Sequence, residues 1–222
     1  NSFFWLFSLD LKSSKKNTQN IILQWIEKNH RYRSKSWEVD IIAKRIIAWI
    51  SNSKLTYEDG DSVYKEKFNS IIKKQINHLI NEIEKSEWID DKMIGCAAII
   101  LAGLSYQNKN DYLNAGLNLL KKIIKFSFGS DGFPKSRNIR QLNFYLKYFV
   151  LIREWLKESQ SEIPEYIDEN IYYLGQAYAF IWQNNKKHIL FNGNHETNNI
   201  DFDHYLQRLG YKFKNKNNEL GG

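Results

Sequence analysis

The chain has 222 residues, of which 42% are hydrophobic and 26% are charged, the balance of an ordinary globular protein. No apolar run reaches the roughly 18 residues of a membrane span, and a single cysteine, Cys96, excludes an internal disulfide. The formal net charge of +7 favours anionic partners such as acidic glycans, nucleic acids or phosphates.

Two helices are expected in the first quarter of the chain. Asn17 or Thr18 can cap the first helix, whose apolar residues recur at helical spacing. A basic, polar connection follows over residues 30–35. The second helix is expected to begin near Ser36, which can serve as its N-cap.

Five further helices are predicted by apolar residues that recur every three or four positions. We expect them at residues 62–85, 90–104, 111–126, 137–158 and about 164–182. Short polar links between seven helices predict antiparallel neighbours. This spacing favours an α/α solenoid or an incomplete toroid of helical hairpins over a single bundle.

The pattern changes after Trp182. Residues 1–182 are interpreted as the helical domain, and residues 183–209 as a polar linker and cleft loop with a short helix near its end. In residues 210–222, the alternation Tyr211-Lys212-Phe213 indicates a β-strand. We therefore expect the start of a truncated β-rich domain there.

The second helix carries a first candidate binding set. Trp37, Arg45 and Trp49 lie eight and four residues apart, on successive turns of one helix. On a concave surface, such aromatics stack on sugar rings and an arginine binds a carboxylate through two hydrogen bonds. The alternative is that both tryptophans belong to the core and Arg45 extends along it or pairs with an acid.

The loop that begins Asp131-Gly132-Phe133-Pro134 carries a second candidate set. It is followed by Arg137 and Asn138 at a helix N-terminus, where free N–H groups favour anions. The alternative is a capped turn, with Ser136 as N-cap and Asp131 bonded to its own loop.

The third candidate set is the segment Asn192-Gly193-Asn194-His195-Glu196, which is the densest polar cluster of the chain. Asparagine and histidine can neutralise a carboxylate through hydrogen bonds, and histidine titrates near neutrality. The alternative is a solvated turn.

Other chemistries find little support in the sequence. There is no phosphate-binding loop, dinucleotide fingerprint or nucleophile elbow. The histidines at 188, 195 and 204 do not have the spacing of a zinc motif. We therefore predict no metal and no cofactor.

Several short motifs occur in a fixed order along the chain. They are Phe3-Phe4-Trp5-Leu6, Ser36-Trp37-Glu38-Val39-Asp40 running into Arg45-Ile46-Ile47-Ala48-Trp49-Ile50, Asp131-Gly132 with Ser136-Arg137-Asn138, and Leu190-Phe191-Asn192-Gly193. In this order and spacing the chain resembles the N-terminal α/α-toroid domain of heparinase II/III-like proteins.

The resemblance implies a fold, an activity and a location. A β-sandwich domain would follow the toroid, with Gly210-Tyr211 near its entry. The expected activity is cleavage of uronic-acid-containing polysaccharides by β-elimination, without metal, in the periplasm or cell envelope. Hydrogen bonds to the uronate carboxylate would stabilise the intermediate, and a tyrosine or histidine would remove the C5 proton.

This chain departs from the family at the helical motif. Pro134 and Ser136 stand where many relatives have histidine and glutamate, and Gln141-Leu142 replaces a Tyr-His pair. The remaining catalytic candidates are Tyr145 and His195. The expected substrate-binding residues are Trp37, Arg45, Trp49, Arg137, Asn138, Asn192 and Asn194.

The departures leave alternatives open. One is a non-catalytic glycan-binding or envelope-assembly protein on the same fold. Another is a helical nucleic-acid or protein binder, supported only by the net charge and the aromatics. The favoured partners are an acidic polysaccharide and the chain's own downstream β-sandwich, with no nucleic acid and no membrane span.

Overall fold

The computed structural model describes residues 1–9, 14–32, 34–106, 110–129, 131–182 and 200–213. Within these ranges the chain is helical, and its only extended pairing is an isolated antiparallel bridge between Phe128 and Pro134. The expectation of an all-α protein is confirmed for this part of the chain. The chain separates into two compact units, Asn1–Ile123 and Ile124–Gly222.

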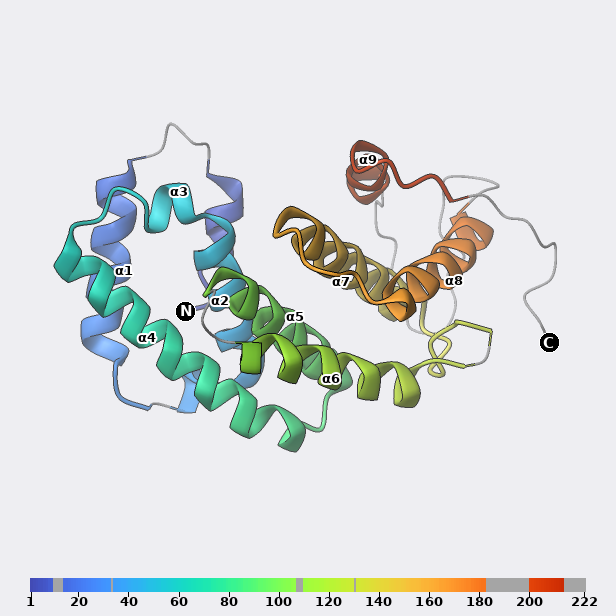
Figure 1. The fold of residues 1–222 in the computed structure, drawn as a ribbon, viewed down its shortest axis with the longest axis horizontal. Coiled ribbons are helices and arrows are strands. Elements are labelled where there is room, and N and C mark those ends of the chain that lie inside the picture. Colours follow the sequence, from blue (N-terminus) through green and yellow to red (C-terminus); the bar gives the residue numbers. More distant parts are fainter. Residues whose placement is uncertain (10–13, 33, 107–109, 130, 183–199, 214–222) are drawn as a thin grey trace. The chain divides into compact units, whose positions relative to one another are not determined.

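The division falls inside a helix, within the predicted helical domain of residues 1–182, and the second unit continues past Trp182. Figure 1 shows the elements in chain order. They are η1 (Phe4–Ser8), α1 (Lys15–Asn29), η2 (Ser34–Ser36), α2 (Val39–Ser51), α3 (Ser53–Thr56), α4 (Ser62–Glu82), η3 (Ile83–Lys85), α5 (Ile89–Ser105), α6 (Asn110–Ser127), α7 (Ile139–Glu158), α8 (Glu165–Trp182) and α9 (Ile200–Arg208).

The first unit is organised around α5. This helix buries every residue from Met93 to Gly103, as its apolar sequence predicts. Helix α2 packs against α5 and α4, and all of its residues from Ile42 to Trp49 are buried except Lys44. The core of this unit therefore lies between α2, α4 and α5.

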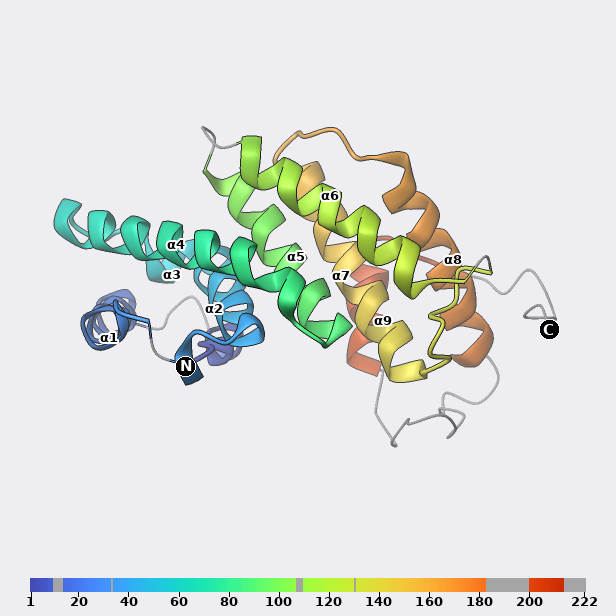
Figure 2. The ribbon, with the colours of Figure 1, turned by 90° about the horizontal axis from the view of Figure 1, so that it is seen from below.

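Helices α5 and α6 approach closely because glycine stands at their contacts (Figures 1 and 2). A Cβ atom on Gly103 would lie 2.5 Å from the backbone nitrogen of Leu113. At a second contact, the Cys96 thiol donates to the carbonyl of Gly116 at 3.1 Å. Burial of Cys96 raises the pKa of its thiol.

The second unit is built on α7 and α8, which pack against each other. Their buried residues follow helical spacing, among them Leu142, Leu146 and Phe149 on α7 and Ile167 and Leu174 on α8. Helix α9 adds Leu206 to this interior, and Tyr178 of α8 donates a hydrogen bond to Asp203 of α9 at 2.9 Å.

Two predicted helix starts are wrong, for local reasons. Ser36 is not the N-cap of α2, which begins at Val39, because its hydroxyl donates to the side chain of Asn29 and its carbonyl accepts from Arg45. Helix α7 begins at Ile139 rather than near Arg137, because Arg137 adopts a left-handed conformation with φ 56°.

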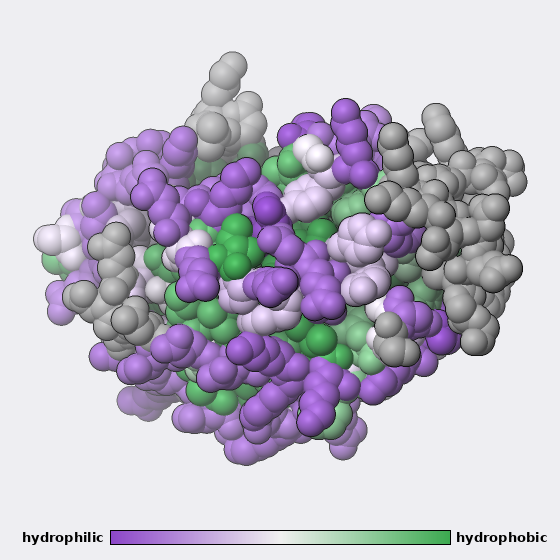
Figure 3. All heavy atoms as spheres, turned by 45° about the vertical axis from the view of Figure 1, so that its right-hand side comes forward, coloured by the Kyte–Doolittle hydropathy of each residue, from purple (hydrophilic) through white to green (hydrophobic). Residues whose placement is uncertain are grey.

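Among the described residues, no helix is both long enough and apolar enough to cross a membrane. On the face drawn in Figure 3, hydrophilic residues alternate with smaller hydrophobic areas. Residues 210–213 form no strand, and the rest of the predicted β-rich segment lies outside the described residues.

Candidate functional site

A pocket of about 370 Å³ lies beside α8 in the second unit. Four α8 residues line one side, and they share a face because they are spaced three, one and four residues apart. The segment that follows α9 lines the other side. The lining residues are Asp168, Ile171, Tyr172, Gln176, Gly210, Tyr211, Lys212 and Phe213.

The turn at the end of α9 directs this segment toward α8. Gly210 has a positive φ of 84°, its N–H donates to Gln207, and the N–H of Tyr211 donates to Leu206 at 2.9 Å. These two bonds form a Schellman motif, which reverses the chain after a helix. The reversal brings residues 211–213 alongside α8.

Gly175 fixes where Phe213 sits on α8. A Cβ atom at Gly175 would lie 2.0 Å from the ring of Phe213, so only glycine leaves room for that ring. The Phe213 ring also lies 6.0 Å from the ring of Tyr211, measured between centroids. The aromatic side of the pocket therefore depends on a helix position without a side chain.

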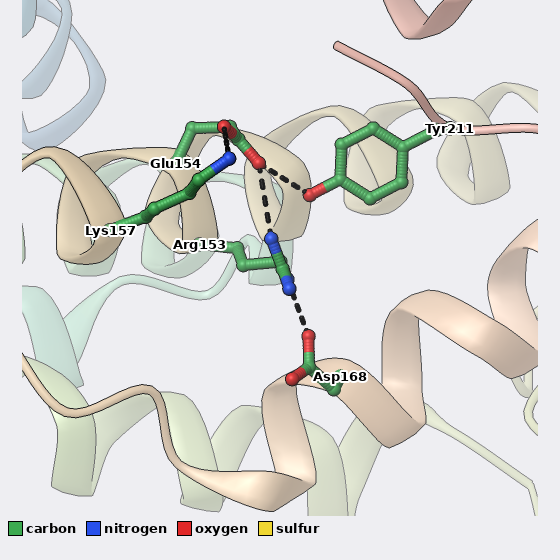
Figure 4. Close-up of polar contacts among 5 residues, drawn as sticks. All are labelled: Arg153, Glu154, Lys157, Asp168 and Tyr211. Carbon is green, nitrogen blue, oxygen red and sulfur yellow. Dashed lines mark hydrogen bonds and ion pairs between the residues drawn. The ribbon is translucent and has the colours of Figure 1, made fainter.

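A polar network joins α7, α8 and Tyr211 behind the pocket (Figure 4). The Tyr211 hydroxyl donates to Glu154 Oε1 at 2.8 Å, and Arg153 Nη1 lies 3.3 Å from the same oxygen. Arg153 Nε donates to Asp168 Oδ1 at 2.5 Å. Lys157 Nζ lies 3.8 Å from Glu154 Oε2. The network holds Tyr211 and Asp168 in fixed positions at the pocket.

The network also sets the protonation of its members. The hydrogen bond from Arg153 to Asp168 raises the pKa of Arg153. Burial raises the pKa of Tyr211, and the hydrogen bond to Glu154 raises it further. Near neutral pH the Tyr211 hydroxyl therefore keeps its proton and acts as a donor, not as a base.

An exposed aromatic pair adjoins the pocket. The rings of Tyr172 and Tyr173 lie 5.5 Å apart at 74°, and the two residues are 48% and 41% exposed. Tyr173 packs against the loop after α6, where a Cβ atom on Gly132 would lie 2.2 Å from the Tyr173 Cβ. The pocket therefore opens beside aromatic side chains that solvent can reach.

The first predicted binding set does not line this pocket. Trp37, Arg45 and Trp49 are 3%, 0% and 0% exposed and belong to the interior of the first unit. The expectation that they face an open cleft needs correction, because their burial matches the core alternative.

The contacts of Arg45 explain how a charge is held in that interior. Its guanidinium donates to the side chain of Gln75 at 2.6 Å and to the carbonyls of Asn1 and Ser36 at 3.0 and 2.9 Å. It also lies 4.0 Å from the ring centroid of Trp25. Burial lowers the pKa of Arg45, while these contacts offset the cost of burying its charge.

The second predicted set lies at the start of α7. The Asn138 side chain accepts hydrogen bonds from the N–H groups of Arg140 and Gln141, so it is the N-cap of the helix. Arg137 Nη1 lies 2.6 Å from Asp131 Oδ2, and the Arg137 side chain is 51% exposed. Asp131 also accepts from the N–H of Phe133, as the capped-turn alternative expects.

Of the two catalytic candidates, Tyr145 lies among the described residues. Tyr145 is 1% exposed, with its ring centroid 5.0 Å from that of Phe128 and 6.0 Å from that of Phe144. A general base must reach the proton that it removes, and this enclosure argues against Tyr145. His195, Asn192 and Asn194 lie outside the described residues.

Sequence reasoning missed the pocket residues. Asp168, Tyr172 and Gln176 recur every four residues, a spacing that places them on one face of a helix and could have marked them. Tyr211 was interpreted as part of a strand. Its link to Glu154 spans 57 residues of sequence, and no local pattern encodes it.

The described residues contain no group of three or more histidine, cysteine, aspartate or glutamate side chains placed to hold a metal ion. Comparison of the chain with models of protein families, with curated proteins and with solved structures finds no significant match.

Proposed function

We propose that the protein binds an acidic polysaccharide and that the pocket beside α8 holds one of its sugar rings. The observation that carries the proposal is the pocket wall, which combines the rings of Tyr172 and Phe213 with the polar side chains of Asp168 and Gln176. Aromatic faces cover the apolar face of a sugar, and carboxylate and amide oxygens accept its hydroxyl protons. A volume of about 370 Å³ suits a small ligand.

The preference for an acidic sugar follows from the cations at this pocket. Lys212 lines it and is exposed, so its ammonium is free to meet a uronate carboxylate. Arg153 stands behind Asp168 and partly neutralises that carboxylate. A charge-assisted hydrogen bond to Lys212 is stronger than one between neutral groups. The net charge of +7 acts in the same direction at longer range.

A second candidate function is β-elimination of the bound uronate, supported by the ordered motifs that resemble heparinase II/III-like proteins. On this proposal the helices are part of an incomplete α/α toroid, a β-sandwich domain completes the site, and the protein works in the periplasm or cell envelope. With Tyr145 enclosed, His195 would serve as the base. The non-catalytic alternative is favoured by Pro134 and Ser136 at the family's histidine and glutamate positions.

The binding proposal is tested by calorimetry with an oligouronate and with a neutral glucan oligosaccharide. Tyr172→Ala and Lys212→Gln should each weaken oligouronate binding, by about tenfold for the tyrosine. Phe126→Ala is the matched control, because Phe126 is 70% exposed in the same unit and does not line the pocket. Unchanged affinity in Tyr172→Ala, or tighter binding of the neutral glucan, would overturn the proposal.

The elimination proposal has its own readout. Cleavage creates an unsaturated uronate that absorbs ultraviolet light, and its appearance can be followed with residues 1–222 and with any longer form of the protein. We expect no product from residues 1–222, because a site completed by a second domain loses its positioning when that domain is missing. Product from residues 1–222 would place a sufficient base in this chain.

A further inference from the structure

The basic connection between α1 and α2 packs onto α4 and presents an aromatic surface. The ring centroid of Tyr32 lies 5.3 Å from that of His78 and 6.2 Å from that of Trp37. Trp37 is 3% exposed and meets His78 edge-on at 5.2 Å, whereas Tyr32 is 64% exposed. Buried Trp37 and half-buried His78 thus contact the Tyr32 ring while much of the residue meets solvent. We call Tyr32, His78 and Lys74 the connection surface.

Lys74 places a cation at this surface. Its ammonium donates to the carbonyl of His30 at 2.5 Å and lies 5.5 Å from the ring centroid of Trp37. These two contacts hold the lysine against the connection, although its side chain is exposed. Further exposed cations stand at Arg31 and Lys35 in the connection itself.

A groove of about 590 Å³ between α1 and α4 adjoins the connection surface and shares Lys74 with it, and its lining also includes His30. Its lining is mixed, with an apolar floor and both acidic and basic residues. The remaining lining residues are Ile26, Glu27, Val63, Glu66, Lys67, Ser70 and Ile71. Lys67 Nζ lies 3.8 Å from Glu27 Oε1, so part of the positive charge is already balanced.

We propose that the connection surface is a second saccharide-binding site, specific for an anionic sugar. One sugar ring stacks on the exposed face of Tyr32, its sulfate or carboxylate group pairs with Lys74, and the next ring enters the groove. The Tyr32 ring already contacts Trp37 and His78 before binding, so part of its side-chain freedom is lost before a ligand arrives. This site lies wholly in the first unit and does not depend on the pocket beside α8.

The same chemistry would suit a nucleic acid less well. A single strand stacks its bases on successive aromatic rings along a continuously basic groove, whereas this surface offers one exposed ring. Glu27 and Glu66 in the adjoining groove would repel a chain of phosphates. In contrast, a saccharide also offers hydroxyls that donate to carboxylates.

The experiment measures binding of a sulfated uronate oligosaccharide to variants of the whole chain. Tyr32→Ala should weaken binding by about tenfold, Tyr32→Phe should retain it, and Lys74→Gln should weaken it and reduce its dependence on salt. The matched control is Lys65→Gln on the same helix. Lys65 also donates to a backbone carbonyl and lies near a tyrosine ring, at 5.2 Å from Tyr57.

The results distinguish the connection surface from the pocket beside α8, and a saccharide from a nucleic acid as the ligand. Loss of binding in Tyr32→Ala with a native circular dichroism spectrum, and not in Lys65→Gln, supports the inference. Loss in Tyr172→Ala with no change in Tyr32→Ala overturns it and leaves the pocket beside α8 standing. The reverse pattern supports the connection surface and counts against that pocket. Tighter binding of oligothymidylate, lost in Tyr32→Ala, would replace the saccharide by a nucleic acid.

Discussion

Arg45, Trp37 and Trp49 show how little a residue's type says about its exposure. The spacing of Trp37, Arg45 and Trp49 predicts a shared helix, but Trp37 lies two residues before α2, and a cleft and a core give the same spacing. What distinguishes them is the set of partners, and those come from distant parts of the chain, such as Asn1 and Gln75 for Arg45. The sequence alone could not supply that set.

Trp49 provides a direct test of this core assignment. Its ring lies between the rings of Phe3, Trp25 and Phe68, with centroids 5.2 to 5.5 Å away. Trp49→Ala should therefore lower the free energy of unfolding by about 3–5 kcal/mol, because it leaves a cavity. Trp88→Ala, at a residue that is 73% exposed, should change it by less than about 0.5 kcal/mol in chemical denaturation. Equal effects would contradict the assignment.

Asp131 makes a pH-dependent contribution to the loop before α7. Burial alone would raise the pKa of Asp131, but the N–H of Phe133 and the guanidinium of Arg137 outweigh it and lower the pKa below its ordinary value of 3.8. A depressed carboxyl pKa stabilises the fold above the unfolded value, and the contribution is lost as pH falls through the folded value.

The corresponding measurement is urea unfolding of Asp131→Asn at several pH values. At neutral pH the variant should be less stable than the natural chain by about 0.5–1 kcal/mol, the size expected for a partly exposed ion pair. The difference should shrink once the pH falls below about 4. Asp201→Asn, at an exposed position, is the control. A difference that persists in acid would show that the ion pair is not its cause.

At the scale of elements, the positions of the helices could be predicted and some of their ends could not. Apolar residues at helical spacing placed α4 to α8 to within a few residues. The start of α7 was misplaced because a single residue, Arg137, adopts a positive φ that its type disfavours. Asn138 then takes the capping role that the capped-turn alternative gave to Ser136. Which polar side chain caps a helix depends on competition among neighbouring side chains for the free backbone N–H groups, and the spacing of apolar residues does not show its outcome.

The close packing of α6 on α5 should depend on Gly103 and not on Gly95. Gly103→Ala places a Cβ atom 2.5 Å from the Leu113 backbone, which cannot move aside without shifting α6, and should destabilise the chain by about 1–3 kcal/mol. In Gly95→Ala the new Cβ atom meets side chains and no backbone, with Ile83 Cδ1 at 2.3 Å and Leu79 Cδ1 at 3.4 Å. Both substitutions raise helix propensity equally, by about 0.8–1 kcal/mol. The difference in thermal stability between the two variants therefore measures the effect of packing against α6. Similar melting temperatures would contradict this account of the crossing.

For the molecule as a whole, the sequence predicted the all-α class but not the assembly of a site. The pocket beside α8 brings together side chains from α8 and from the segment after α9, and the network behind it adds α7. The interpretation of residues 211–213 as a strand rested on an alternation of only three residues, which a helix-ending turn produces equally well. Such long-range pairings are set by tertiary packing and carry no local signal.

The net charge of +7 predicts how polysaccharide binding by the whole chain depends on salt. Binding of acidic polysaccharide should weaken steeply as salt rises, since at about 1 M salt the Debye length falls to about 3 Å. Binding of a neutral glucan should be weak at every salt concentration. Affinity for the acidic chain that is independent of salt, measured by calorimetry, would show that apolar stacking alone drives recognition.

The buried thiol of Cys96, between α5 and α6, can report when the first unit opens. Cys96 is the single cysteine and is fully enclosed, with its pKa raised by burial, so a thiol reagent has no target while the helices stay together. Every labelling event therefore records an opening of the first unit. When closing is faster than labelling, the labelling rate measures the free energy of that opening in native buffer, without denaturant and without a mutation.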